Sequence, residues 1–124
     1  MPHTDPAAAP QAAPVLTKAV QRAAARLGIH QKDLARVLGV SPASVSRLGA
    51  GRTIDPGAKE GELALLLIRV FRSLDAMVGG DEQRARAWFR ARCAPLAGVP
   101  AELVTSVRGL LAVAEYLDAM RGKL

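Results

Sequence analysis

The sequence predicts an all-α protein, and three observations support that fold class. Half of the 124 residues are hydrophobic but only four are aromatic, so leucine, valine and alanine must build the core, which favours helices over a β-sandwich. Between Leu63 and Met77 the apolar residues keep the spacing of one buried helix face. No stretch of any length shows the apolar–polar alternation of a strand. The chain is long enough for one compact domain or two very small ones.

Capping residues and glycines divide the chain into successive helices. Side chains that accept hydrogen bonds from the free amides of a helix start precede several of the helical patterns. They belong to Thr17, Ser41, Asp55 and Asp81. Glycines, which end a helix readily, follow the patterns at Gly28, Gly39 and Gly79–Gly80. The predicted helices cover residues 15–27, 31–38, 42–48, 56–78, 82–90, 100–105 and 107–121.

The first 14 residues differ in composition from the rest of the chain. They contain four of the eight prolines, at every fourth position, and each proline removes a backbone donor and disfavours helix at the preceding residue. We therefore predict a disordered tail over residues 1–14. After it we expect a helix-turn-helix bundle over 15–56, a connecting or dimerisation helix over 57–80, and a small helical domain over 81–124.

The net charge of +6 is concentrated in one part of the sequence. Residues 15–59 carry eight basic and two acidic side chains, whereas residues 60–124 carry nine basic and eight acidic ones. This asymmetry indicates a polyanionic partner for the first half and a different role for the second. Because the aromatic residues are few and scattered, a surface that stacks single-stranded bases is not expected.

Several functions are disfavoured by what the sequence lacks. The single cysteine, Cys93, permits no internal disulfide or CxxC pair, and it is expected to be a small buried filler. We expect no metal site, no cofactor and no catalytic constellation, because His3 and His30 stand apart from other ligating groups. Neither a signal peptide nor a membrane span is predicted, since the longest apolar run, Leu63 to Ile68, is too short. A cytoplasmic, non-enzymatic protein is therefore expected.

The first motif is QKDLARVLGVSPASVSRLGAGR, residues 31–52. Two short helices joined by Gly39-Val40-Ser41 have the layout of a helix-turn-helix unit, in which the second helix enters the major groove. The motif resembles the Xre/Cro family of helix-turn-helix regulators. By that resemblance, two groups of residues would face operator DNA. The helix-turn-helix positions are Gln31, Ser41, Ala43, Ser44 and Arg47, and the phosphate contacts are Lys32 and Arg52.

The side chains of this motif have limited capacity to distinguish bases. Arg47 and Gln31 are able to form two hydrogen bonds with one base, whereas Ala43 offers only a methyl group. Most of the affinity would therefore come from phosphate neutralisation, which depends on salt and carries little sequence information. The alternative is a small bundle whose basic face is only solvated.

The second motif lies in residues 88–122 and begins with a tryptophan, followed by a Pro/Gly-rich loop, a short helix and a final helix. It resembles the toxin-binding domain of the MbcA/ParS/Xre antitoxins. The matching positions are Trp88, Leu96–Gly98, Pro100, Leu103–Val104, Ser106–Gly109, Val113, Leu117 and Gly122. Trp88 and Phe89 are expected in the core. Ala97 stands where that family has a glycine, and Ser106 replaces a threonine with a hydroxyl that is able to cap a helix or contact a partner.

The resemblance implies an antitoxin that neutralises a RES-domain toxin, an enzyme that consumes NAD or transfers its ADP-ribose. In that family the C-terminal part of the antitoxin covers the NAD cleft of the toxin. The implied contacts are Ser106, Arg108, Met120, Arg121, Gly122, Lys123 and Leu124. A basic side chain or the terminal carboxylate would compete there for groups that bind the dinucleotide. The alternative for Arg121 and Lys123 is that they only stabilise the negative end of the last helix.

The predicted function is therefore inhibition of a RES-type toxin combined with repression of the protein's own operon. The apolar stripe between Leu63 and Met77 is long for one small bundle, so we also expect a homodimer within a larger toxin–antitoxin complex. A dimer would place two recognition helices about 34 Å apart, on successive major grooves. Two alternatives remain: a stand-alone Xre-family regulator whose C-terminal region only dimerises, and a protein inhibitor whose DNA motif is vestigial.

Overall fold

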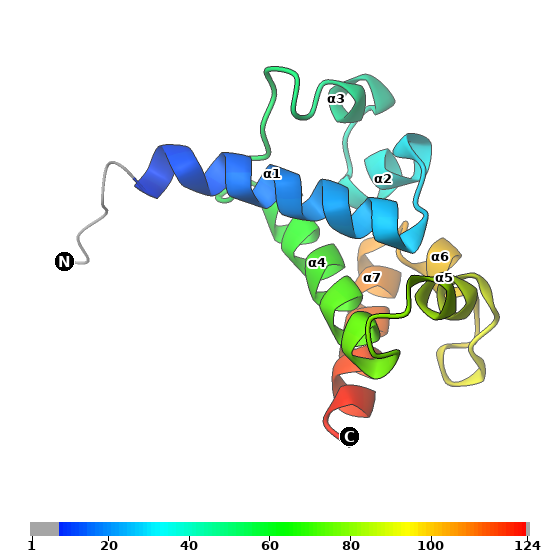
Figure 1. Ribbon diagram of the computed structural model, residues 1–124. Helices are drawn as coiled ribbons and strands as arrows, with labels where there is room; N and C mark the ends of the chain where they lie inside the picture. Colours follow the sequence, from blue (N-terminus) through cyan, green and yellow to red (C-terminus); the bar gives the residue numbers. More distant parts are fainter. Residues whose placement is uncertain (1–7, 124) are drawn as a thin grey trace.

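The computed structural model describes residues 8–123, and within them the chain is helical with no strand (Figure 1). The all-α fold is thus confirmed, with the helix-turn-helix unit before a second group of helices. None of the described helices has both the length and the apolar character needed to cross a membrane. The helices are α1 (Ala8–Leu27), α2 (Gln31–Leu38), α3 (Pro42–Ser46), α4 (Lys59–Met77), α5 (Glu82–Arg90), α6 (Pro100–Leu103) and α7 (Val107–Arg121), with a 3-10 turn, η1 (Ala94–Leu96).

Helix α4 is the central element of the fold. It packs against α1, α2, α5 and α7, and it runs beside α7 towards the C-terminus (Figure 1). α1 crosses the upper part of α4, and α2 and α3 lie at the end of the molecule opposite the C-terminus (Figure 1). The motif that resembles a DNA-binding unit and the end of α7 are therefore far apart on the molecule.

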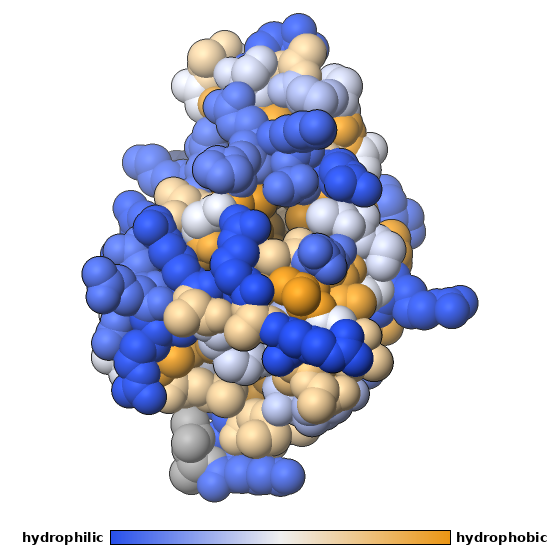
Figure 2. All heavy atoms as spheres, turned by 90° about the vertical axis from the view of Figure 1, so that its right-hand side faces the viewer, coloured by the Kyte–Doolittle hydropathy of each residue, from blue (hydrophilic) through white to orange (hydrophobic). Residues whose placement is uncertain are grey.

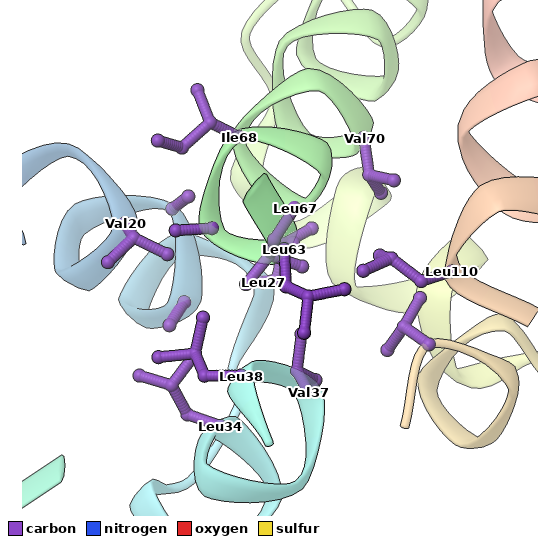
Figure 3. Packing of buried hydrophobic residues seen from close by; sticks show 14 of the residues in the cluster. Val20, Leu27, Leu34, Val37, Leu38, Leu63, Leu67, Ile68, Val70 and Leu110 are labelled. Atoms are coloured by element: carbon purple, nitrogen blue, oxygen red, sulfur yellow. The ribbon is translucent and has the colours of Figure 1, made fainter. Parts of the chain in front are cut away.

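One hydrophobic core joins the two groups of helices. Figure 3 shows Leu27 of α1, Leu38 of α2 and Leu63 of α4 directed towards one another, and Leu110 of α7 beside Val70 of α4. All five side chains are buried. On the face that carries α5 and α6, hydrophilic residues dominate the upper and left parts of the surface, and hydrophobic ones gather across its lower half (Figure 2). Burial of the leucine and valine side chains is the main source of stability here, because each contributes about 1.5–3 kcal/mol.

The helix starts at Ser41, Asp81 and Ser106 form as capping chemistry predicts. Ser41 Oγ accepts a hydrogen bond from the Ser44 amide at 3.1 Å, and Asp81 Oδ1 accepts one from the Arg84 amide at 3.2 Å. Ser106 Oγ accepts one from the Gly109 amide at 3.1 Å. Each bond satisfies an amide that has no partner within its own helix. The predicted bounds of α2, α5 and α7 are confirmed.

Helix α1 begins earlier than predicted, at Ala8 instead of Val15. The prediction of a tail was therefore wrong for residues 8–14, and residues 1–7 lie outside the described part of the chain. Pro10 is in the first turn, where an amide donor has no intrahelical partner, and Pro14 removes a single hydrogen bond from a helix of 20 residues. The prediction overestimated the free-energy cost of these prolines, because it considered only neighbouring residues and not the packing that holds the rest of α1.

Thr17 is inside α1 and does not cap it, contrary to the prediction. Its buried hydroxyl donates to the Ala13 carbonyl at 2.7 Å and accepts a hydrogen bond from the Ile54 amide at 2.8 Å. The Ile54 side chain is fully buried. Thr17 therefore fastens the segment before α4 to α1, a role that depends on two residues far apart in the sequence.

Further predicted bounds were wrong in α3, α4 and α6: α4 ends at Met77 instead of residue 78, and α6 ends at Leu103 instead of residue 105. α4 starts at Lys59, because Asp55 Oδ1 accepts from the Gly57 amide at 2.9 Å and closes a turn before the helix. α3 ends at Ser46, and the chain then turns through Gly49, which has a positive φ of 80°. In both places a local turn competes with the helix and replaces its first or last residues.

Two candidate binding surfaces

The turn between α2 and α3 is held by Gly39. Its φ of 69° lies in the left-handed region, which costs a glycine little. The amides of Gly39 and Val40 both donate to the Ala35 carbonyl, the latter at 3.0 Å, so the end of α2 is capped. Val45 and Leu48 are buried beneath α3. The opposite side of α3 is left open to solvent, as a recognition helix requires.

Most of the residues predicted to face DNA are exposed around this helix. The exposed ones are Gln31, Lys32, Ser41, Ala43 and Arg47, and Ser44 is half-buried. Ser41 Oγ also donates to Ser44 Oγ at 3.0 Å, so both hydroxyls are already engaged at the cap. Gln31 and Arg47 are exposed, and their planar groups are able to form two hydrogen bonds with one base edge. The surface is open and basic but offers few groups for direct base recognition.

Arg52 stands apart from the other predicted DNA contacts. Its Nη2 lies 2.6 Å from Glu60 Oε2, and the two side chains are 27% and 15% exposed. The charge of Arg52 is therefore largely balanced inside the fold. Gln21 of α1, which was not predicted, donates to the Leu48 carbonyl at 3.0 Å and holds the same loop. Lys32 and Arg47 form no ion pair within residues 8–123.

The residues predicted to contact a toxin fall into two groups at opposite ends of α7. Ser106 caps the helix and the exposed Arg108 is in its first turn. Met120, Arg121, Gly122 and Lys123 are at the other end, and Leu124 lies outside the described residues. A helix of 15 residues is about 22 Å long. A single small contact cannot include both groups.

A groove between α4 and α7 was missed by sequence reasoning. It consists of two adjoining hollows, which share Leu65 and Arg69. The apolar hollow, of about 420 Å³, is lined by Glu62, Leu65, Leu66, Arg69, Val107 and Leu111. The cationic hollow, of about 610 Å³, is lined by Leu65, Ile68, Arg69, Arg72, Ser73, Asp118, Arg121 and Gly122. Leu65, Val107 and Leu111 are 54%, 62% and 41% exposed, although each is a large apolar side chain.

The apolar stripe of α4 is mostly buried by the chain itself. Leu63, Leu67, Val70 and Leu74 are buried within the fold, and Leu66 and Met77 are partly buried. The unburied apolar surface is instead on the side of α4 that carries Leu65. Leu65 does not follow the spacing of the buried stripe, and this feature of the sequence indicates an apolar side chain on the outer side of the helix.

Asp118 organises the cationic hollow. Its Oδ2 accepts from Arg69 Nε at 2.6 Å and its Oδ1 accepts from Ser73 Oγ at 2.8 Å, which ties α7 to α4. The hydrogen bond with Arg69 holds the pKa of Asp118 below its ordinary value of 3.8, against the opposing effect of burial, and Ser73 adds to the lowering. Asp118 is thus held in its ionised form between α4 and α7, and the nearby charge of Arg121 also favours that form.

Trp88, the tryptophan of the second motif, has a structural role in the packing of the helices. The rings of Trp88 and Tyr116 are stacked with centroids 6.3 Å apart and an angle of 9° between planes. Phe89 is fully buried and Cys93 is buried, as predicted, whereas Trp88, which was predicted in the core, is only partly buried and packs against it. Burial raises the pKa of Tyr116 above its ordinary value of 10.0, and a hydrogen bond with the Cys93 thiol raises it further. These residues hold α5, η1 and α7 together.

A helix-turn-helix unit with an exposed basic face, followed by helices that carry an open groove, is the architecture of a helix-turn-helix protein with an appended helical domain. The family comparison is specific on both parts. Residues 6–69 match the antitoxin Xre-like helix-turn-helix domain, and residues 73–123 match the antitoxin Xre/MbcA/ParS C-terminal toxin-binding domain. The chain belongs to the Xre/MbcA/ParS antitoxins, and it is the antitoxin of a toxin–antitoxin system. A search of curated proteins found no match.

Proposed function

We propose that this protein inhibits a RES-domain toxin in the cytoplasm by placing its C-terminal residues over the NAD site of the toxin. The observation that carries the proposal is an exposed basic end of α7, with Arg121 and Lys123, in a segment that matches a toxin-binding domain. Neither side chain forms an ion pair within residues 8–123. Both are therefore free to bind acidic or hydrogen-bond-accepting groups of the toxin at its NAD site. The antitoxin itself acts by binding and carries out no reaction.

Co-expression with the toxin encoded beside this chain tests the proposal. The full chain should restore growth and suppress NAD consumption by the purified toxin. A variant that ends after Met120 should do neither, although it keeps the buried Leu117 and the Asp118 network. The double variant Arg121→Glu, Lys123→Glu should weaken inhibition in the same direction. Full inhibition by the shortened chain would show that residues 121–124 do not cover the NAD site.

We also propose that the helix-turn-helix unit represses the operon of the protein by binding its operator. The exposed Gln31, Lys32 and Arg47 support this, and the engaged hydroxyls of Ser41 and Ser44 limit sequence discrimination. In a gel shift with the promoter at two salt concentrations, Arg47→Ala should weaken binding and Arg84→Ala on α5 should not. Binding that ignores sequence and disappears at modest salt would instead favour a vestigial DNA motif.

The exposed apolar hollow supports a homodimer. Leu65, Val107 and Leu111 form an unpaired apolar surface, which soluble proteins usually cover with a partner. We propose that a second copy covers it, and that α4 serves as the connecting and dimerisation helix between the two matched domains. Light scattering at micromolar concentration should give twice the monomer mass for the wild type and the monomer mass for Val107→Asp. A monomeric wild type would remove the dimer from the proposed function.

A further inference from the structure

We propose that the cationic hollow between α4 and α7 binds an acidic segment of the toxin that lies outside the NAD cleft of the toxin. This inference rests on the proposed function and adds a second anchor to the contact made by the end of α7. The occupant would present a carboxylate to Arg72, which does not belong to the end of α7, and an apolar side chain to Leu65 where it lines the cationic hollow.

The charge of the hollow carries the inference. Three guanidinium groups and one carboxylate line it, and the carboxylate of Asp118 is already bound by Arg69 and Ser73. Arg72 and Arg121 are exposed and form no ion pair in the part of the chain that the structure describes. Arg121 stabilises the ionised Asp118 electrostatically, whereas Arg72 does not, so the charge of Arg72 remains for a partner. A guanidinium fork favours a carboxylate, because it is able to donate two parallel hydrogen bonds.

The shape of the hollow favours a protein segment. Its volume of about 610 Å³ accommodates several side chains, and its lining combines apolar residues with arginines. A DNA backbone would place phosphates against the arginines but would leave the exposed Leu65 without apolar contact on this side. The DNA-facing helix α3 also lies at the end of the molecule opposite the C-terminus (Figure 1), so a duplex on α3 does not extend to the hollow.

The position of the hollow relates it to the proposed inhibitory contact. Gly122, which directly follows α7, is part of its lining together with Arg121. A toxin bound to residues 120–123 therefore has its surface next to the hollow. The two contacts would strengthen each other, because a toxin already held at one of them loses less translational and rotational freedom when it forms the other.

Charge reversal at Arg72 tests the inference without altering the end of α7. Arg72 is exposed, so Arg72→Glu should fold, and circular dichroism confirms this for each variant. Binding to the purified toxin encoded beside the chain is measured by calorimetry at two salt concentrations. Arg72→Glu should weaken binding about tenfold or more, most strongly at low salt, and Arg72→Lys should remain within about threefold of wild type. Arg84→Glu, an exposed charge reversal on α5, is the matched control and should leave affinity unchanged.

The outcomes separate this inference from the proposed function. If the full chain fails to bind the toxin, both are overturned. If the full chain binds, the variant ending after Met120 loses inhibition, and Arg72→Glu behaves like Arg84→Glu, the acidic anchor is overturned and the proposed function stands. Weaker operator binding by Arg72→Glu with unchanged toxin affinity would assign the hollow to nucleic acid and overturn the inference. Restoration of Arg72→Glu binding by a Glu-to-Lys or Asp-to-Lys change in the toxin would confirm it.

Discussion

Arg86 of α5 donates a hydrogen bond from Nη2 to the carbonyl of Ala25 in α1 at 2.8 Å. Its Nε donates to the neighbouring Arg26 carbonyl at 3.1 Å. These carbonyls belong to the last turn of α1, where a positive charge is favourable because the helix dipole is negative at that end. The arginine lies in the segment that matches the toxin-binding domain, and its acceptors lie in the segment that matches the helix-turn-helix domain. The two parts of the antitoxin are therefore joined by a directed polar contact.

Replacing Arg86 should weaken this junction. Arg86→Met keeps much of the length of the side chain but removes its donors, and we expect the free energy of unfolding to fall by about 1 kcal/mol. Urea denaturation measures the change. Arg84→Met on the same helix is the control, because the Arg84 side chain makes no hydrogen bond among the described residues. Equal stability of the two variants would show that the junction contributes nothing to folding.

The buried Thr17 hydroxyl is expected to contribute to the free energy of unfolding. Thr17→Val leaves the Ile54 amide without its acceptor in a buried position, and we expect a loss of about 1–3 kcal/mol in the free energy of unfolding. Thr17→Ser keeps the hydroxyl and should recover most of that loss. Thermal unfolding of the three proteins side by side provides the measurement, and a valine variant as stable as the serine variant would contradict the prediction.

Gly109 is required by a close backbone approach at the start of α7. A Cβ at this position would lie 2.0 Å from the Leu103 carbonyl oxygen and 2.7 Å from its carbon. Gly109→Ala should therefore destabilise the fold by about 1–3 kcal/mol, as overpacking against rigid atoms does. Gly122→Ala is the comparison, since its Cβ would meet nothing closer than 3.5 Å. Denaturant midpoints should separate the two variants clearly.

Ala97 has a left-handed backbone, with a φ of 55°. An L-residue with a Cβ pays a steric cost there of about 1–2 kcal/mol, and glycine avoids it. Ala97→Gly should therefore raise the free energy of unfolding, by about 1 kcal/mol or less because glycine also gains freedom in the unfolded chain. Ala91→Gly, at a residue with extended backbone and φ of −93°, should bring no gain. An equal increase in the free energy of unfolding for both variants would rule out backbone strain at Ala97 as the cause.

The stability should depend on pH through Asp118. Because Arg69 and Ser73 lower its pKa below 3.8 in the folded protein, Asp118 stabilises the fold fully at neutral pH. That contribution is lost as the pH falls below about 5, through the unfolded value and then through the lower folded value. Asp118→Asn should be less stable than wild type near pH 7, and the difference should narrow towards about pH 3. Urea unfolding across this range measures it, with Asp75→Asn as a control for loss of a carboxylate on α4.

The helices that could be predicted from the sequence are those whose limits depend on neighbouring residues. Ser41, Asp81 and Ser106 cap α3, α5 and α7 through amides three residues away, so sequence alone locates them. The start of α1 could not be predicted in this way. There the cost of Pro14 is offset by contacts with residues distant in the sequence, including the hydrogen bond between Thr17 and Ile54.

The candidate binding residues also divide into those that the local sequence predicts and those that only contacts between distant residues determine. The sequence by itself determined the all-α class, the helix-turn-helix unit and the basic residues around α3, because periodicity, caps and charge are local properties. Only the tertiary structure decided that Arg52 is neutralised by Glu60, and that Arg69 and Arg72 line a groove with Arg121. The groove depends on how α4 and α7 pack side by side, about 50 residues apart in the chain, whereas the pair of Arg52 and Glu60 depends on how the chain turns into α4. Packing, not composition, selects which charges are paired and which apolar side chains remain for a partner.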